Sequence, residues 1–492
     1  MRTGRVATIL TLSTTLGCFG LTGCGSGALG RLPDGLTPAD LNLVIVTLDT
    51  TRADRLGCYG YRDVRTPHLD SLARGGVLFS QAHATAPLTL PSHASLFTGK
   101  YPPAHGVRDN GGYFLADTER TLAETLRAGG YSTGGFVSAY VLDHRWGIAQ
   151  GFDLYFDDFD LLKFNTVSMG DIQRRGDVTL ERAIDWIRQQ AGRRFFAWLH
   201  LYDPHSPYEP PEPFVTAYAG RAYVGEIAWT DSLVGQLVDE LSRTGLTGRT
   251  LVVVAGDHGE SLDEHNESGH AFFVYDSTMH VPLIMSGPWP GLAGRRIPEV
   301  VSLVDVMPTI LDLLGAGPPV GAQGRSLRPL LEGRSPSTPP AAYSESFYAR
   351  FHFGWSDLRS LRTDHYRFIE APRPELYDIT RDPGEVENLA GALPRVVAAM
   401  RATMARVEDE MGEAPEAAPP AEMDEETLRK LAALGYVGST VDTTGKSSAD
   451  LADPKDKIGI VNRMHEARES FLSGDTATSI KALKEIIADS PE

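Results

Sequence analysis

The chain has 492 residues, a length that suits two or three domains, and its 64 acidic and 46 basic residues give a net charge of −18. Nucleic-acid-binding proteins need a basic surface, so this charge argues against a nucleic-acid partner. Two of the three cysteines, Cys18 and Cys24, fall near the N-terminus, so we expect no disulfide framework. The third, Cys58, is expected to be a small packed residue.

Residues 1–24 have the pattern of an export signal. Arg2 and Arg5 supply positive charge, and the apolar stretch that follows is too short to span a bilayer. The stretch ends in Leu-Thr-Gly-Cys, which resembles a bacterial lipobox, so we expect a lipid on Cys24 that attaches the protein to a membrane. A plain cleaved signal peptide is the alternative. The sequence therefore predicts an exported protein of the cell envelope, with residues 25–40 as a tether.

Three nearly continuous apolar runs predict strands that are buried on both faces of a parallel sheet. These runs cover residues 41–48, 195–200 and 251–255. Asp49 follows the first run, and Asp257 and His258 follow the third. Open α/β sheets bind ligands at the carboxyl ends of their strands, so we expect these side chains to converge. His205 lies in a proline-rich loop after the second run, where a histidine more often has a surface or packing role.

Residues 89–99 predict a turn that leads into a short helix. A helix N-terminus offers free backbone N–H groups and a positive dipole end, and both favour an anion near Thr89. Taken alone, such a segment is more often an ordinary helix start, here with Ser92 as its N-cap. Asn110, followed by two glycines, is either part of a turn or an amide brought to the same place.

Residues 89–99 resemble the sulfatase signature, Cys/Ser-x-Pro-Ser-Arg-x-x-x-Leu-Thr-Gly. Thr89 stands where the family has Cys or Ser, and His93 stands where it has Arg. The resemblance extends from about residue 41 to about residue 440. It implies an alkaline-phosphatase-like α/β fold with a large mixed or parallel central sheet flanked by helices, over residues 41–335. A small C-terminal subdomain with an antiparallel sheet would then occupy residues 336–440.

The resemblance also implies the members of the site. Asp49, Asp257, His258 and the Thr89 oxygen match the family's metal ligands, and an oxygen-rich set with one imidazole suits Zn²⁺, Mn²⁺ or Ca²⁺. His205 belongs to the Asp-Pro-His-x-Pro-Tyr element, which carries an active-site histidine in the family. The catalytic group would be completed by further residues that match family positions: His93, Asn110 and His270.

The resemblance leaves the number of metal ions open. His270 stands where typical sulfatases have Lys and where phosphoethanolamine transferases of the same superfamily have His. His205 and His270 would either hold the second ion or protonate the leaving oxygen, so we expect one or two ions. Thr50 and Asp203 are weaker candidates for the same site.

Thr89 decides the expected chemistry. Sulfatases oxidise their Cys or Ser to an aldehyde, and Thr is not a substrate for that maturation, so Thr89 must act as a metal-activated alcohol. The family's Gly-Lys-x-His clamp for sulfate is also missing, because residues 135–139 are Gly-Phe-Val-Ser-Ala. We therefore expect hydrolysis of an anionic phosphate or phosphonate ester. The alternatives are sulfate-ester hydrolysis, a phosphoethanolamine-type phosphoryl transfer, and an inactive anchored scaffold.

The C-terminal residues predict a helical appendix. Residues 441–453 are a polar linker, and residues 454–492 predict two amphipathic helices with a break at Gly474. The pair resembles one tetratricopeptide unit, with Ala482, Leu483, Ile486 and Ile487 as core positions. Such repeats stabilise one another, so we expect the chain to continue past residue 492 and to bind a protein partner through the repeats.

Overall fold

The computed structural model describes residues 29–159, 172–190, 192–317, 321–335, 340–412 and 441–489. The expected leader, with Cys24, lies outside these ranges. Among the described helices, none is both long enough and apolar enough to cross a membrane.

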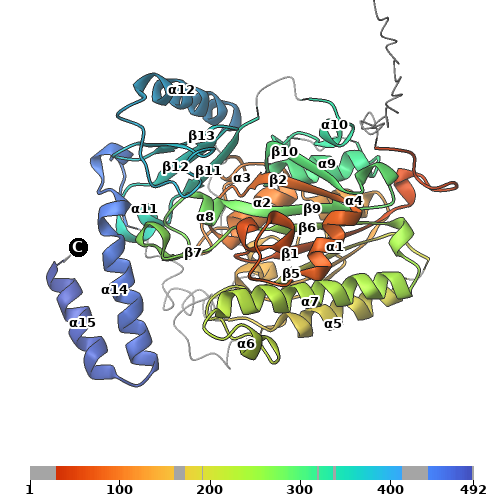
Figure 1. Ribbon diagram of the computed structural model, residues 1–492, viewed down its shortest axis with the longest axis horizontal. Coiled ribbons are helices and arrows are strands. Elements are labelled where there is room, and N and C mark those ends of the chain that lie inside the picture. Colours follow the sequence, from red (N-terminus) through yellow and green to blue (C-terminus); the bar gives the residue numbers. More distant parts are fainter. Residues whose placement is uncertain are drawn as a thin grey trace, which may run out of the picture.

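An eight-stranded sheet forms the centre of the described chain, in the order β10-β2-β9-β6-β1-β5-β3-β4 (Figure 1). Its strands are β1 Asn42–Leu48, β2 Val77–His83, β3 Ser132–Phe136, β4 Leu154–Phe156, β5 Phe195–Leu201, β6 Thr250–Gly256, β9 His280–Ser286 and β10 Arg295–Ser302. Strand β1 pairs in parallel with both β5 and β6, as the three apolar runs predicted. Strand β9 runs antiparallel to β2 and β6, so the sheet is mixed.

Helices cover both faces of this sheet. Side chains alternate between the two faces along each strand, and the strands are apolar on both faces, so both faces have to be covered. Along β1, Val44 and Val46 pack with helices on one face, and Leu43 and Ile45 pack with helices on the other. The first face is covered by α1 Pro67–Gly75, α5 Gly176–Gln189 and α7 Ala222–Arg243, and the second by α2 Thr89–Thr98, α4 Leu122–Ala128 and α9 Val306–Leu313. The predicted α/β class is confirmed.

A second, smaller sheet follows the catalytic region, as predicted. Its four strands are antiparallel: β11 Ala342–Ser346, β12 Leu358–Arg362, β13 Tyr366–Glu370 and β14 Glu375–Asp378. Helix α12, Pro394–Met411, packs on this sheet through Met400 and Met404. Short elements complete the described chain: α3 Pro102–His105, α6 Phe214–Ala217, α8 Asp276–Met279, α10 Arg328–Leu331, α11 Tyr348–Phe353, β7 Ser261–Leu262 and β8 Ser268–Gly269.

The small subdomain is joined to the loop before Asn110 by partly buried polar contacts. Arg108 binds Glu345 of β11 through two hydrogen bonds of 2.7 and 2.8 Å. Asp109, the next residue, lies 2.7 Å from His352 of α11. These contacts hold the loop that leads to Asn110, so the small subdomain helps to position the site.

The C-terminal segment forms a helical hairpin, α14 Pro454–Leu472 and α15 Thr476–Asp489, whose helices lie side by side (Figure 1). Residues 441–453, expected as a linker, are bound along their length; for example, the Val441 amide donates to the Phe351 carbonyl and Ser448 to Asp357. Ile486 is buried, but Leu483 and Ile487 are 42% and 64% exposed. The prediction that both are core positions is wrong, because the face of α15 turned away from α14 has no partner among the described residues. The tetratricopeptide resemblance stays a prediction.

Candidate active site

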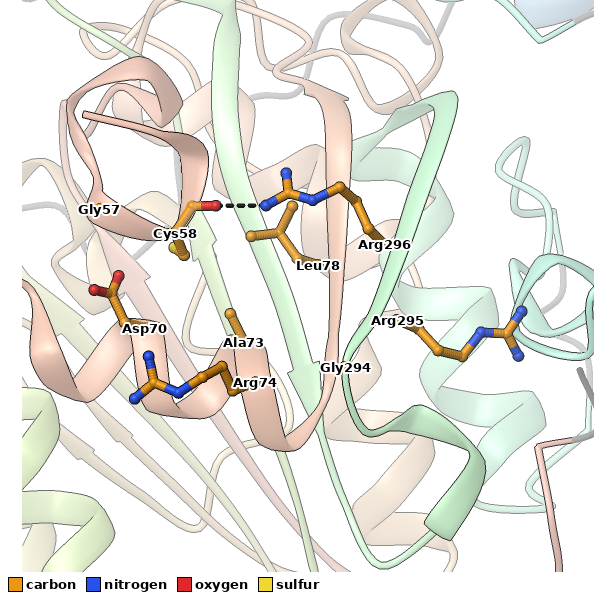
Figure 2. Close-up of a pocket in the computed structure, with 9 residues that line it drawn as sticks. All are labelled: Gly57, Cys58, Asp70, Ala73, Arg74, Leu78, Gly294, Arg295 and Arg296. Carbon is orange, nitrogen blue, oxygen red and sulfur yellow. Dashed lines mark hydrogen bonds between the residues drawn. The ribbon is translucent and has the colours of Figure 1, made fainter. Parts of the chain in front are cut away.

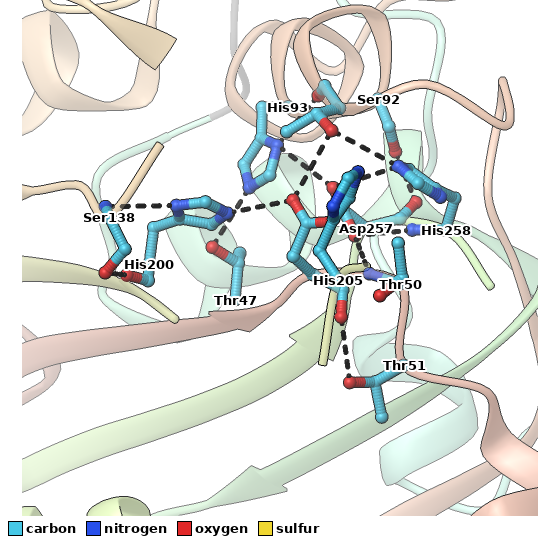
Figure 3. A network of polar contacts seen from close by, with 12 residues as sticks. Thr47, Thr50, Thr51, Ser92, His93, Ser138, His200, His205, Asp257 and His258 are labelled. Atoms are coloured by element: carbon cyan, nitrogen blue, oxygen red, sulfur yellow. Dashed lines mark hydrogen bonds and ion pairs between the residues drawn. The ribbon is translucent and has the colours of Figure 1, made fainter. Parts of the chain in front are cut away.

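The carboxyl ends of β1 and β6 meet the N-terminus of α2 at one edge of the large sheet (Figure 3). Asp49 follows β1, and Asp257 and His258 follow β6; one ligand atom from each lies within 4.8 Å of the others. Thr89 is the first residue of α2, and its Oγ1 lies 3.4 Å from Asp49 Oδ2 and 3.3 Å from His258 Nε2. The structure thus brings together the four residues that the sequence analysis assigned to a metal.

Two hydrogen bonds near the N-terminus of α2 fix the helix at this edge of the sheet. Ser92 lies inside the helix and donates to the Asp257 carbonyl at 2.5 Å, so it is not the N-cap, which is Leu88. Asn110 Oδ1 accepts the Leu90 N–H at 2.8 Å and so satisfies one free donor of the first turn. Asn110 therefore reaches the site, where its carbonyl oxygen orients the N-terminus of α2.

His93 is part of the support of Thr89. Its Nδ1 donates to the Thr89 carbonyl at 2.8 Å, and its Nε2 accepts from the Thr47 hydroxyl at 3.0 Å. Thr47 Oγ1 in turn accepts from Trp198 Nε1 at 2.9 Å. Burial and the nearby His200 hold the pKa of His93 well below its ordinary value. With both nitrogens engaged by protein groups, His93 is a positioning residue rather than the catalytic residue expected from the sequence.

The orientation of His258 suits a metal ligand. Its Nδ1 lies 3.0 Å from the Gly259 carbonyl, which can only accept, so Nδ1 carries the proton. The lone pair of Nε2 therefore points toward Thr89. Burial, with the positive charge of His270, holds the pKa of His258 well below its ordinary value, so the ring is neutral. Metal-binding histidines commonly donate their second nitrogen to a carbonyl in this way.

The carboxylates of Asp49 and Asp257 are buried close together, and each has one oxygen without a hydrogen bond. Asp49 Oδ1 and Asp257 Oδ2 have no hydrogen-bond partner within the described chain. Burial raises the pKa of Asp49 to about 7, and burial together with the Asp49 charge raises that of Asp257 well above its ordinary value. Buried carboxylates that repel each other are stabilised by a cation. The donor set of carboxylates, a hydroxyl and one imidazole therefore fits a divalent metal ion.

His205 and His270 lie beside this group and differ in charge. Burial and the charge of His270 lower the pKa of His205 to about 3, and its Nδ1 donates to the Ser206 carbonyl at 2.5 Å. His270 Nδ1 lies 3.1 Å from Glu260 Oε1; burial opposes its charge, but Glu260, Asp49 and Glu267 together raise the pKa of His270 to about 9. The two ring centres are 5.1 Å apart. A neutral imidazole and an imidazolium thus face the same space.

Comparison with known proteins identifies the family. A family model described as Sulfatase matches residues 41–316, more than half of the chain. The chain belongs to the sulfatase family. A second model, described as N-sulphoglucosamine sulphohydrolase, C-terminal, matches residues 269–410, which include the small sheet. The protein is therefore a hydrolase of the sulfatase family.

Several sulfatases are among the similar proteins. An ulvan-active sulfatase of Formosa agariphila is 26% identical, in an alignment that covers 72% of this chain and 78% of that protein. Arylsulfatase K of Xenopus laevis is 25% identical, over 68% of this chain and 76% of its own. The crystal structure of a phosphonate monoester hydrolase of Agrobacterium radiobacter superposes with a TM-score of 0.66 at 23% identity, over 75% of this chain and 96% of that one. This last likeness shows that the fold is shared.

Sequence reasoning missed two buried residues of this sulfatase-family site. His200 Nε2 lies 3.1 Å from Asp49 Oδ2, while its Nδ1 accepts the Ser138 N–H at 3.4 Å. Burial lowers the pKa of His200 to about 3, so a neutral ring donates to Asp49. Glu260, fully buried, is the partner of His270. His200 could have been found from the sequence, because it ends a predicted buried strand, as ligand-binding residues of such sheets often do. Glu260 could have been found because it belongs to the segment Asp-His-Gly-Glu, which begins with two of the expected metal ligands.

The two weaker candidates for a second metal lie differently. The Thr50 amide donates to Asp257 Oδ1 at 3.2 Å, and its own hydroxyl is buried without a hydrogen-bond partner in the described chain, so Thr50 belongs to the site. Asp203 Oδ1 accepts from Gly176 N at 3.0 Å and from Trp229 Nε1 at 2.9 Å. Asp203 Oδ1 thus connects α5 and α7, while its Oδ2 is buried without a hydrogen-bond partner among the described residues; Asp203 lies outside the group of Asp49, Asp257 and His258, and its role as a metal ligand stays a prediction.

A hollow of about 280 Å³ lies away from this site, beside the starts of β2 and β10 (Figure 2). It is lined by Gly57, Cys58, Asp70, Ala73, Arg74, Leu78, Gly294, Arg295 and Arg296. Burial, with the charge of Asp70, raises the pKa of Cys58 to about 12, so its thiol stays protonated and unreactive. The hollow is at the opposite end of the strands from Thr89 and contains no activated nucleophile.

Proposed function

We propose that this sulfatase-family hydrolase cleaves a phosphate or phosphonate ester, with the Thr89 hydroxyl as the nucleophile. The observation that carries the proposal is the place of Thr89 Oγ1, within 3.4 Å of Asp49 and His258 and at the N-terminus of α2. The helix end adds free N–H groups and a positive dipole end for an anionic group.

In this proposal, different residues around Thr89 serve different steps of the reaction. A divalent cation held by Asp49, Asp257 and His258 would lower the pKa of the Thr89 hydroxyl and stabilise negative charge on the attacked group. The His270 imidazolium can donate a proton to the leaving oxygen. His205 is neutral and can take a proton from the water that later cleaves the Thr89 ester. The raised pKa of His270 keeps its ring protonated, and the lowered pKa of His205 keeps its ring neutral, with the lone pair on Nε2 because Nδ1 donates to the Ser206 carbonyl.

The nucleophile favours phosphorus over sulfur. Thr89 cannot become the aldehyde of the usual sulfatases, so the enzyme ester must be cleaved by a second displacement. A metal site supports such a displacement better for the more highly charged phosphoryl group. Where the family has its Lys–His clamp, Ser138 of this chain donates to the His200 carbonyl at 2.8 Å and adds no positive charge.

Sulfate-ester hydrolysis is the second candidate, because the ulvan-active sulfatase and arylsulfatase K are among the relatives of this chain. Phosphoryl transfer to an alcohol would share the first displacement and differ only in the acceptor. An inactive scaffold is disfavoured by the unpaired carboxylate oxygens of Asp49 and Asp257, which would be costly to keep without a ligand.

The direct test is a substrate panel with metal-reconstituted protein: 4-nitrophenyl phosphate, bis(4-nitrophenyl) phosphate, 4-nitrophenyl phenylphosphonate and 4-nitrophenyl sulfate. We expect the largest kcat/KM for one of the phosphorus esters. A larger kcat/KM for the sulfate than for every phosphorus ester would reject the proposed substrate class.

Two proposals concern partners. A lipid on Cys24 would attach the protein to a membrane of the cell envelope, in agreement with the Leu-Thr-Gly-Cys motif. The exposed apolar side chains of α15, Leu483 and Ile487, are compatible with a protein partner at the helical hairpin.

A further inference from the structure

The first turn of α2 is capped by a residue from another segment of the chain. The N-cap of the helix, Leu88, has no side-chain oxygen that could accept a hydrogen bond, so the free N–H groups of this turn need an acceptor from elsewhere. Asn110 supplies it, because its Oδ1 accepts the Leu90 N–H at 2.8 Å. Leu90 directly follows Thr89. The bond from Asn110 therefore helps to set the direction in which the Thr89 hydroxyl points.

Asn110 is itself held by the carboxylate of Asp109, which is 2% exposed. One oxygen, Oδ1, accepts the Asn110 N–H at 2.6 Å, and the other, Oδ2, lies 2.7 Å from Nε2 of His352. A carboxylate can only accept, so Nε2 carries the proton and donates it, and a hydrogen bond to an ionised group is stronger than one between neutral groups. A continuous set of hydrogen bonds thus leads from His352 to the backbone of Leu90.

His352 is held in place by its own helix, α11. Arg350 of the same helix binds Asp357 at 2.7 Å and the Lys446 carbonyl at 2.8 Å. The ring of His352 packs against Tyr348, with ring centres 4.3 Å apart. A donor that packing already fixes loses little conformational entropy when it binds its acceptor. The small subdomain therefore presents this imidazole as a fixed anchor.

We propose that Asp109 and His352 are positioning residues for Thr89. The pair acts through Asn110: it fixes the amide that caps α2, and the capped turn aims the Thr89 hydroxyl at the candidate metal ligands. Small displacements of a reacting group slow a reaction strongly, so a residue that fixes this direction contributes to turnover without touching the substrate. The proposal rests on the proposed function only in taking Thr89 as the nucleophile.

The first test measures the capped turn directly. His352→Phe keeps an aromatic ring beside Tyr348 and removes the donor to Asp109. This variant should increase hydrogen–deuterium exchange in peptides covering residues 86–98, while peptides of α7 stay unchanged. His365→Ala is the matched control, because His365 is an exposed histidine of the same subdomain. Unchanged exchange in residues 86–98 of His352→Phe would overturn the positioning role, whether or not any ester is hydrolysed.

The second test separates positioning from a merely structural role. With 4-nitrophenyl phosphate, His352→Phe should lower kcat about tenfold and leave KM within about twofold, because a misdirected nucleophile slows the chemical step more than it weakens substrate binding. His352→Gln keeps an N–H donor and should regain most of the lost kcat. Metal content, measured by elemental analysis, should be the same in all three proteins. An unchanged kcat in His352→Phe, or an equal loss in both variants, would overturn the proposal.

Two further arms keep these outcomes distinct. If His352→Phe unfolds well below the wild-type temperature, Asp109→Asn takes its place in both tests, because this change keeps the side-chain volume and removes the charge that binds His352. If the wild type hydrolyses 4-nitrophenyl sulfate but no phosphorus ester, the same comparison with the sulfate decides the positioning role, and only the proposed phosphorus specificity fails.

Discussion

His270 Nδ1 lies 3.1 Å from Glu260 Oε1, in a place where neither side chain meets bulk solvent freely. Burial opposes the charge of His270, but Glu260, with the negative charges of Asp49 and Glu267, raises the pKa of the imidazole to about 9. The pair thus supplies a positive charge at a position where typical sulfatases have a lysine. An imidazolium at this place can donate its proton to a leaving oxygen.

Glu260→Gln should therefore change the pH dependence of turnover. An acid with a raised pKa is protonated below that pKa, so activity that needs protonated His270 is lost as the pH rises through about 9. Without the carboxylate, this loss should move to lower pH, and esters with poor leaving groups should suffer most. The measurement is kcat/KM against pH, with Glu264→Gln as the control. An unmoved alkaline limb would exclude His270 as the proton donor.

Asp257→Ala should remove the metal and lower turnover by at least about 10²-fold, as expected when a metal ion supplies several kcal/mol of transition-state stabilisation. Asp203→Asn is the matched comparison, because Asp203 binds Gly176 and Trp229 instead of the metal group. That variant should keep its metal and lose only stability. Elemental analysis and thermal unfolding distinguish the two effects; metal retained by Asp257→Ala would contradict the assignment.

Variants of Thr89 test the nucleophile. Thr89→Ala should remove turnover but leave part of the metal bound, since Asp49, Asp257 and His258 remain. Thr89→Ser should keep measurable activity, because only a methyl group is lost. Acid-quenched wild type should carry a phosphoryl group on unmodified Thr89 in peptide mass spectrometry. Finding the phosphoryl group on another residue would show that Thr89 is not the nucleophile.

Two glutamates should affect stability in opposite directions as the pH changes. Burial and the charge of Asp203 raise the pKa of Glu226 to about 8, above the ordinary 4.5. The native protein then holds a proton that the unfolded chain releases, so the free energy of unfolding falls as the pH rises from 4.5 to about 8. Glu226→Gln should therefore be more stable than the wild type at pH 8 and similar at pH 4.5.

For Glu240, the free energy of unfolding should depend on pH in the opposite direction, because its pKa is lowered in the folded protein. Hydrogen bonds from Arg188 and Arg243 lower the pKa of Glu240 to about 2. Its stabilising effect is present above the ordinary pKa of 4.5 and is lost as the pH falls through about 2. Glu240→Gln should lose stability at pH 8. Urea unfolding at both pH values measures these changes, and equal shifts in both variants would contradict the assignment.

Cys24→Ala tests the membrane attachment. A lipobox cysteine is the residue that receives the lipid, so the variant should appear in the soluble fraction or remain unprocessed. Membrane fractionation with immunodetection measures this, and Cys58→Ala is the control cysteine. If Cys24→Ala stays in the membrane fraction like the wild type, the lipid anchor is ruled out.

The metal group could be predicted from the sequence because its members are adjacent to strong local signals. Asp49, Asp257 and His258 directly follow apolar runs that can only be buried strands, and parallel strands deliver their carboxyl ends to one edge. Thr89 begins a short helix, and the turn that leads into this helix could be predicted from the sequence. In each case a short stretch of sequence determines both the element and the residue at its end.

The remaining assignments depended on contacts between distant segments. His200 meets Asp49 because β5 pairs with β1 in a register that sets His200 opposite Thr47, and a shift of one residue would turn its side chain to the other face. Asp203 follows the same strand but turns to α5 and α7. Helix α14 reaches the His270 loop only because its apolar face joins the main core. Local sequence determines which elements form, whereas register and packing between elements, which depend on the whole chain, decide which side chains share a site.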